Sequence, residues 1–156
     1  MKQHEHNKET DYEAILEAAA ALTGGVPHRI ANLANLSALI YHALDRLNWA
    51  GFYLSEGDRL VLGPFQGKPA CIEIPLGKGV CGTAAASGKT LLVPDVHLFP
   101  GHIACDADSA SELVVPIKKD GRVVGVIDLD SPEKGRFTED DARGLERLAE
   151  LISAFI

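Results

Sequence analysis

The sequence predicts an α+β fold, in which helices at both ends of the chain cover one face of a mainly antiparallel sheet. Two observations carry this prediction. Before Trp49 and again after Thr138, apolar residues recur every three or four positions, which is the period of amphipathic helices. Between these stretches, short runs of β-branched and aromatic residues are separated by Gly and Asp turns, which indicates strands joined by hairpins.

Length and charge limit the organisation of the protein. The 156 residues are enough for one hydrophobic core and few for two, so we expect a single domain over residues 1–156. The formal net charge of -7 offers no basic field for phosphates, so nucleic acid is not an expected partner. The sequence has neither the apolar core of a signal peptide nor a membrane-spanning apolar run, and we expect a cytoplasmic protein without membrane contact.

Two helices are predicted before the sheet. The first runs from about Asp11 to Leu22, because Thr10 and Glu13 have the spacing of a capping box and Gly24 follows as a stop. The second runs from about His28 to Leu47, where apolar residues recur at three- and four-residue steps. Its apolar stripe is expected to pack on the sheet.

The centre of the chain predicts about six strands and one short helix. Small residues over Val80–Ser87, followed by Gly88, indicate a short helix with a glycine stop. The pair Asp120-Gly121 is typical of a tight hairpin. The predicted strands are Trp49–Leu54, Arg59–Phe65, Cys71–Ile74, Leu91–Val93, Glu112–Lys118 and Val123–Asp130.

A last helix is predicted to close the fold. Thr138 is a good N-cap residue, and the acidic side chains that follow it favour the positive end of a helix. Leu145, Leu148 and Ile152 then form one apolar stripe. We expect this helix to cover the same face of the sheet as the N-terminal helices.

The long connection Pro94–Ser111 is the candidate functional loop, because loops of this length in compact domains are usually functional or disordered. Leu98, Phe99 and Ile103 favour a loop that packs back on the domain. The loop also carries Cys105, whose thiolate would be the reactive form. The neighbouring Asp106 and Asp108 would raise the pKa of this thiol, and an inert, half-buried cysteine is the alternative.

The chain has three cysteines, and an odd number without an export signal indicates packing or redox chemistry rather than a disulfide framework. Cys71 lies at the start of a predicted strand. Cys81 lies between glycines at a predicted helix start, where it is either a core residue or a redox partner with a pKa lowered by the helix.

A metal site is not expected. Possible ligand types gather at His97, His102, Cys105, Asp106 and Asp108. Their spacing matches neither the paired cysteines and histidines of a structural zinc site nor a helical His-x-x-x-His motif.

Two pairs of residues are expected to share one face of the sheet. Asp128 and Asp130 alternate with apolar residues, so they either form a pocket or mark the solvated end of a strand. Trp49 and Tyr53 are four residues apart on a strand. They are either core residues or an aromatic wall with the indole and phenol polar tips turned toward a small ligand.

Four segments carry a family resemblance: NWAGFY (48–53), LVLGPFQGKPACIEIPLGKGVCGTAA (60–85), VPDVHLFPGHIACDADSASELVVPI (93–117) and GVIDLDSP (125–132). In these segments the chain closely resembles the free methionine-R-sulfoxide reductases, enzymes built on a GAF domain. The resemblance runs from about Leu36 to Leu148, and the first 25 or so residues carry no diagnostic motif. It implies a GAF-like sheet with a loop-covered pocket on the face opposite the terminal helices.

The resemblance also implies roles for eight residues. Cys105 falls on the catalytic cysteine, Cys71 on the resolving cysteine and Cys81 on an auxiliary thiol. Glu112, Asp128 and Asp130 fall on acidic pocket positions, and Trp49 and Tyr53 on aromatic ones. Asp130 and Glu112 are expected nearer the chemistry, with Asp128 in support.

The implied reaction is the reduction of free methionine-R-sulfoxide. A sulfoxide sulfur becomes electrophilic when its oxygen is protonated or strongly hydrogen-bonded, so a carboxylic acid must assist. Attack by the Cys105 thiolate releases methionine and leaves a sulfenic acid, which Cys71 converts to a disulfide. Thioredoxin is the expected external reductant, and no bound cofactor is implied. The acidic pocket suits the ammonium group of a free amino acid.

The predicted hairpin conflicts with the expected role of Glu112. A two-residue turn at Asp120-Gly121 pairs Glu112 with Leu129 and turns it away from the two aspartates of the neighbouring strand. Either Glu112 precedes the regular strand or a bulge shifts the register, with Pro116 as the expected position.

Two other functions fit the sequence. The chain could be a GAF module that binds a small ligand without catalysis, or a thiol-based redox sensor without a substrate. The exposed side of the terminal helices also offers a surface for a homodimer.

Overall fold

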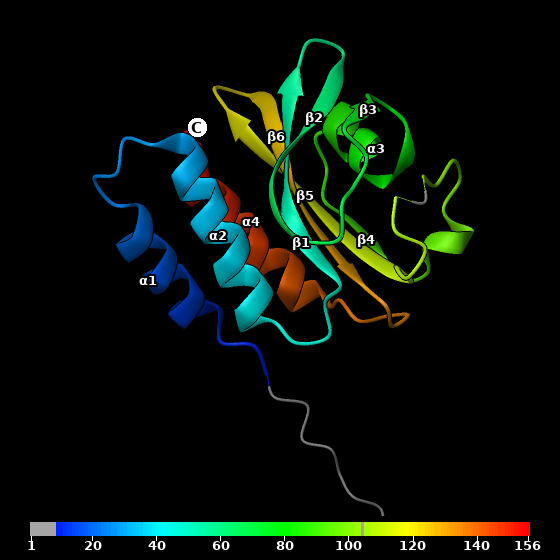
Figure 1. Cartoon of the computed structure of the whole chain (residues 1–156), viewed down its shortest axis with the longest axis horizontal. Helices are drawn as coiled ribbons and strands as arrows, with labels where there is room; N and C mark the ends of the chain where they lie inside the picture. The colour runs from blue at the N-terminus through cyan, green and yellow to red at the C-terminus, as the bar shows by residue number, and fades with distance from the viewer. Residues whose placement is uncertain (1–8, 104) are drawn as a thin grey trace, which may run out of the picture.

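A computed structural model describes residues 9–103 and 105–156, and Figure 1 shows its arrangement. The described part of the chain contains one six-stranded antiparallel sheet in the order β3-β2-β1-β6-β5-β4, and the predicted α+β architecture is confirmed. The elements are α1 (Tyr12–Thr23), α2 (Arg29–Ala43), β1 (Trp49–Glu56), β2 (Arg59–Gly67), β3 (Glu73–Pro75), α3 (Gly79–Ser87), β4 (Leu91–Val93), the 3₁₀ helix η1 (Val96–Leu98), β5 (Ser111–Lys119), β6 (Arg122–Ser131) and α4 (Glu139–Ser153).

The sheet separates two hydrophobic clusters. On one face α2 and α4 pack on the strands, and α1 lies on the outer side of these two helices (Figure 1). The opposite face carries α3 and the connection through η1. The terminal helices therefore cover one face, as predicted, and leave the other face for the loops.

Local signals fix several helix ends. Thr138 caps α4 in a capping box with Asp141, as its position predicts, and Gly88 ends α3 in the left-handed conformation at φ 67°. The predicted cap of α1 at Thr10 is wrong. Asp11 is the N-cap residue, and its carboxylate accepts a hydrogen bond of 3.0 Å from the backbone N–H of Ala14.

The predicted end of α2 is also wrong, because the helix ends at Ala43 rather than near Leu47. Leu44 is already extended, and Arg46 has a φ of 58°. Leu44 and Leu47 still pack in the same cluster as α2, so the apolar periodicity continues past the last helical residue. Leu44 and Leu47 therefore pack with α2 although both lie outside the helix.

A bulge next to the β5–β6 hairpin sets which face each strand residue occupies. The turn itself pairs Lys118 with Val123, as a two-residue hairpin requires. The register then shifts between Ile117 and Lys118, one position after Pro116, where the bulge is expected. The extra residue is Val124, on β6. Glu112 consequently pairs with Asp130 instead of Leu129, which resolves the conflict in the sequence.

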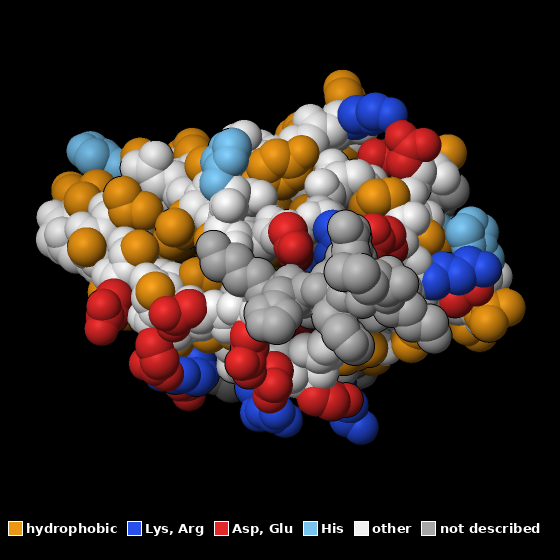
Figure 2. Space-filling view, turned by 90° about the horizontal axis from the view of Figure 1, so that it is seen from below, with side chains coloured by type: hydrophobic (Ala, Val, Ile, Leu, Met, Phe, Trp, Pro, Cys, Tyr) orange, Lys and Arg blue, Asp and Glu red, His pale blue; other side chains and the backbone are white. Residues whose placement is uncertain are grey.

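The surface drawn in Figure 2 mixes charges of both signs. Lys and Arg side chains lie beside Asp and Glu side chains on this face, and hydrophobic side chains gather toward the end where α1 and α2 lie. None of the helices in residues 9–103 and 105–156 is long and apolar enough to cross a membrane.

A buried ion-pair network joins α4 to the segment that leads into β1. The side chain of Arg136 is 5% exposed and donates to Asp141 at 3.3 Å and to the carboxylate of Asp45 at 3.1 Å. Tyr12 donates its hydroxyl to the same Asp141 at 2.5 Å, which ties α1 to the network. The start of β1 is therefore anchored to the helical layer.

Replacing Arg136 with Leu is expected to lower the free energy of unfolding by about 3 to 5 kcal/mol, because Asp141 would remain buried without its cation. Urea unfolding monitored by circular dichroism measures this change. The matched control is Arg59→Leu, which removes ion pairs of a half-exposed arginine and should cost less than about 1 kcal/mol. Equal losses in the two variants would contradict the network's role.

Candidate active site

A pocket lies on the face of the sheet opposite the terminal helices, and the loop between β4 and β5 covers it. Its empty space, including the entrance, is about 530 Å³. Seven of the eight residues singled out in the sequence line it, and the eighth, Cys71, is bonded to one of the seven. These seven are Trp49, Tyr53, Cys81, Cys105, Glu112, Asp128 and Asp130.

Three carboxylic acids form the floor of this pocket. Glu112 on β5 pairs with Asp130 on β6, and Asp128 lies two residues away on the same face. Glu112 is 7% exposed and Asp128 is 5% exposed. Burial, followed by the neighbouring carboxylates, raises the pKa values of Glu112 and Asp130 well above the usual range, and burial also raises the pKa of Asp128. The cluster therefore retains protons where exposed acids lose them.

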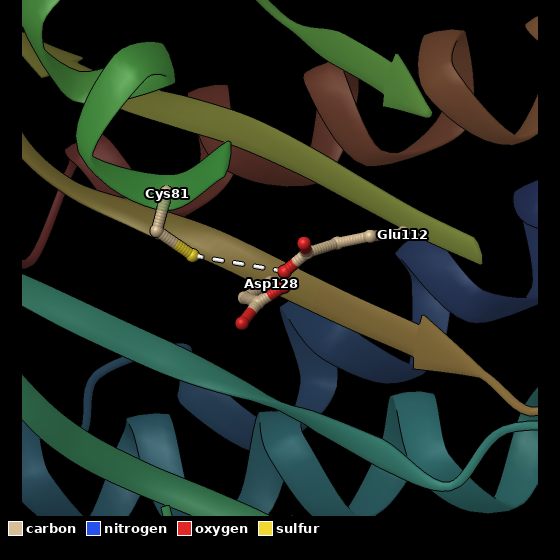
Figure 3. A group of neighbouring side chains, drawn as sticks. All are labelled: Cys81, Glu112 and Asp128. Carbon is tan, nitrogen blue, oxygen red and sulfur yellow. Dashed lines mark hydrogen bonds between the residues drawn. The ribbon is translucent and has the colours of Figure 1, made fainter. Parts of the chain in front are cut away.

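Cys81 completes the acid cluster from above. It lies in the first turn of α3, and its Sγ is 4.0 Å from Oε2 of Glu112 (Figure 3). The positive end of a helix would lower the pKa of the Cys81 thiol, as the sequence suggests, but the surroundings of Cys81 have the opposite effect. Burial, followed by the charges of Asp128 and Glu112, raises the pKa of the Cys81 thiol. Cys81 is thus a protonated, hydrogen-bonding thiol in this arrangement.

The same three side chains have the chemistry of metal ligands. One ligand atom from each of Cys81, Glu112 and Asp128 lies within 4.8 Å of the other two. Metal binding would require these groups to release the protons that burial favours. Three of the loop residues with ligand chemistry have other partners: His97 contacts Asp95 at 2.9 Å, Asp108 contacts Lys68 at 2.7 Å, and Cys105 is bonded to Cys71.

Cys105 reaches Cys71 from the covering loop. A disulfide joins the two residues, and their Cα atoms are 5.5 Å apart. The prediction that Cys71 begins a strand is wrong, because β3 begins at Glu73. Cys71 lies in the connection before β3, where its carbonyl accepts from the Tyr53 hydroxyl and its sulfur is bonded to Cys105. Phe99 and Ile103 pack the loop on the pocket-side cluster, whereas Leu98 is 81% exposed and does not contribute.

The two predicted aromatic residues form a stacked wall. Trp49 and Tyr53 are each 2% exposed, with ring centroids 5.9 Å apart. Phe65 also stacks on Trp49, with ring centroids 5.1 Å apart, a contribution that the sequence pattern did not single out. The polar tips do not turn to the pocket. The indole N–H donates to the carbonyl of Lys68 at 3.2 Å, and the Tyr53 hydroxyl donates to the carbonyl of Cys71 at 2.9 Å.

Two residues that sequence reasoning missed hold the acidic neighbours of Cys105. Asn48 donates its side-chain N–H groups to Asp106 at 3.1 Å and to Ser109 at 3.0 Å. Lys68 pairs with Asp108. Both aspartates therefore have partners other than the Cys105 sulfur. Asn48 directly precedes Trp49, and this position was the one indication that it belongs to the site. No local sequence pattern indicates which residues its side chain contacts.

Unpaired buried polar atoms mark this region. In the described part of the chain, Oδ1 of Asn48, Nδ1 of His102 and Oδ1 of Asp128 are buried without a hydrogen-bond partner. His102 and Asp128 line the pocket, and Asn48 bonds to Asp106 and Ser109, which also line it. Because buried polar atoms are nearly always paired, their gathering at one pocket indicates a site that accepts a polar ligand.

The chain is similar to known proteins over most of its length. The family model described as a GAF domain matches residues 30–156. A free methionine-R-sulfoxide reductase of Escherichia coli is 52% identical over 142 residues, which cover 91% of this chain and 86% of that protein.

Solved structures extend the comparison. The structure of fRMsr of Staphylococcus aureus in complex with substrate superposes with a TM-score of 0.89 at 50% identity, and covers 94% of this chain and 96% of that one. The free methionine-R-sulfoxide reductase of Neisseria meningitidis, in complex with its substrate, superposes with a TM-score of 0.90 at 44% identity, with 92% and 87% covered.

The acid cluster predicts how stability changes with pH. Acids with raised pKa values bind more protons in the folded than in the unfolded protein, so the free energy of unfolding falls as pH rises above about 4. The slope is at most about 1.4 kcal/mol per pH unit for each proton. Between pH 5 and 8, we expect Glu112→Gln to flatten this slope and to stabilise the protein at pH 8.

Urea unfolding of the oxidised protein at several pH values measures the effect. The matched control is Glu56→Gln, which changes an exposed carboxylate and should keep the wild-type slope. If Glu112→Gln also keeps that slope, Glu112 does not hold an extra proton in the folded state.

Proposed function

We propose that this chain, which belongs to the free methionine-R-sulfoxide reductases built on a GAF domain, reduces free methionine-R-sulfoxide to methionine through the thiols of Cys105 and Cys71. The observation that carries the proposal is the meeting of three buried carboxylic acids and this cysteine pair at one pocket. Acids supply protons to a sulfoxide oxygen, and thiols supply the electrons.

The acid floor gives a physical basis for the choice of a free amino acid. Oδ1 of Asp128 is a buried acceptor without a partner, and an ammonium group would satisfy it. A nearby cation also favours the ionised form of one of the acids, so substrate binding would release the proton that burial retains. A peptide-bound methionine has no such charge, and its chain would have to leave an enclosed pocket in both directions.

The first chemical step transfers the sulfoxide oxygen to Cys105. Asp130 and Glu112 protonate or hydrogen-bond the oxygen, which makes the sulfoxide sulfur electrophilic, and Asp128 supports them. The Cys105 thiolate attacks that sulfur and forms a transient S–S bond. The protonated oxygen then passes to the Cys105 sulfur, as the S–O bond to the methionine sulfur and the transient S–S bond break. Methionine leaves with its sulfur reduced by two electrons, and Cys105 remains as a sulfenic acid, oxidised by two electrons.

The second step closes the disulfide. The Cys71 thiol attacks the sulfenic sulfur of Cys105, the S–O bond breaks and water leaves. An external dithiol such as thioredoxin then reduces the disulfide by two successive exchanges and restores both thiols. In these steps thiols supply the electrons and acids supply the protons, so the proposed reaction uses no bound metal or cofactor.

The rings of Trp49 and Tyr53 supply the apolar wall for the substrate side chain. Their polar tips are engaged with the Cys71 segment, so the ring faces and not the tips would contact the ligand. Cys81 acts as an auxiliary thiol that donates to the acid cluster rather than as the partner of Cys105.

In this proposal residues 1–156 act as a single domain. A homodimer remains a prediction. Exposed apolar side chains on the α1–α2 side, Leu22 at 41% and Ile30 at 59%, are the surface that favours it.

Turnover is tested by NADPH consumption with thioredoxin, thioredoxin reductase and free methionine-R-sulfoxide. The wild type should consume NADPH, and Cys105→Ser should abolish consumption. Cys71→Ser is the matched variant: it should release one methionine per protein after acid quenching, because its first step needs only Cys105. Wild-type protein without turnover, or Cys105→Ser with turnover, would refute the proposal. A disulfide formed with peroxide but no turnover would favour the redox sensor.

Recognition of the ammonium is tested with N-acetylmethionine-R-sulfoxide, which lacks that charge. We expect its kcat/KM to be about 10- to 100-fold lower than that of the free amino acid, because a charged hydrogen bond is lost. In Asp128→Asn the difference between the two substrates should shrink. Equal kcat/KM values in the wild type would mean that the pocket does not select for the free amine.

A further inference from the structure

One stretch of the chain, from Asn48 to Tyr53, holds both cysteine segments through side-chain hydrogen bonds. The aromatic side chains contact the Cys71 segment, and the amide of Asn48 contacts the Cys105 loop. These contacts come from residues on one strand and the position just before it. The two thiols therefore share a single hydrogen-bonded support.

On the Cys71 side, the support is rigid. Tyr53 is 2% exposed and stacked on Trp49, so its ring has little freedom to move. Its hydroxyl donates to the carbonyl oxygen of Cys71 itself, and the indole N–H of Trp49 donates to Lys68, three residues earlier. The two bonds fix the backbone of the segment directly before the Cys71 sulfur.

On the Cys105 side, Asn48 bridges the loop and the acid cluster. Its side chain donates to Asp106 and Ser109, which follow Cys105 in the loop. Its backbone N–H donates to the carbonyl of Asp130 at 3.0 Å. The loop is thus fixed relative to the strand that carries the acids.

We propose that Asn48, Trp49 and Tyr53 are positioning residues that hold the sulfur of Cys71 within reach of Cys105 and so drive disulfide closure. This inference rests on the proposed function for the roles of the two cysteines. The step it assists is the attack of the Cys71 thiol on the Cys105 sulfenic acid, with loss of water. Holding the two segments raises the effective concentration of one thiol beside the other.

The decisive change is Tyr53→Phe, which removes one hydroxyl and keeps the aromatic wall. A net hydrogen bond of ordinary strength corresponds to a change of about three- to tenfold in an equilibrium constant. We therefore expect the equilibrium constant for the Cys71–Cys105 disulfide to fall about three- to tenfold. Titration against reduced and oxidised dithiothreitol, with thiols counted by alkylation and mass spectrometry, measures this constant without any sulfoxide.

Two further variants sharpen the test. Tyr41→Phe is the matched control, because Tyr41 belongs to α2 on the other side of the sheet and should leave the constant unchanged. Asn48→Ala removes the bonds to Asp106 and Ser109 and should lower the constant by at least a similar factor. Thermal melting of the reduced proteins separates this effect from a general loss of stability, which would lower the melting temperature instead.

The kinetic readout distinguishes positioning from substrate binding. In Tyr53→Phe, the Cys105 sulfenic acid, trapped with dimedone, should persist longer than in the wild type, because disulfide closure follows the binding and reduction of the sulfoxide. A disulfide constant equal to that of the wild type would overturn the inference. Because the titration needs no substrate, its result stands apart from the turnover assay that tests the proposed function.

Discussion

The site depends on the pairing register of β5 and β6. Side chains alternate across a sheet, so a one-residue slip would move Glu112 to the helical face and leave it in the apolar cluster there. The bulge at Val124 prevents this, because it absorbs one residue between the tight Asp120-Gly121 turn and the rest of the ladder. Glu112 then lies beside Asp130, and the α3 helix above brings Cys81 to the same point. A single irregularity in the hairpin thus assembles the acid floor of the pocket.

Burying three acids together is costly, and the structure reduces the cost with protons rather than with cations. The Cys81 thiol, whose Sγ is 4.0 Å from Oε2 of Glu112, supplies a local hydrogen-bond donor. A protonated acid cluster that faces a thiol is what sulfoxide reduction needs, since the oxygen must gain a proton as the sulfur is attacked. The unpaired Oδ1 of Asp128 fits the same account, because its missing donor is one that an amino-acid substrate carries. In the proposed reaction, the acids that are costly to bury are therefore the groups that would bind and activate the substrate.

Local patterns predicted much of this fold, and contacts between distant segments account for the errors. Thr138, Gly88 and the Asp120-Gly121 turn act through their own backbone neighbours, so their effects are readable in the sequence. The end of α2 was misplaced because Leu44 stays buried after the helix stops. Seven of the eight site residues line the pocket, but their placement was expected from the family resemblance more than from chemistry. The hydrogen bonds of the aromatic tips and of Asn48 were missed, because backbone carbonyls and loop side chains brought near by folding leave no local pattern.

The measurement that tests the central claim most directly is a single turnover followed by disulfide mapping. Fully reduced protein is mixed with one equivalent of free methionine-R-sulfoxide, the released methionine is quantified, and the quenched protein is alkylated, digested and analysed by mass spectrometry. The account predicts one methionine per protein, a Cys71–Cys105 bridge and an alkylated Cys81. Release of no methionine, or a bridge between Cys71 and Cys81 that leaves Cys105 alkylated, would contradict it.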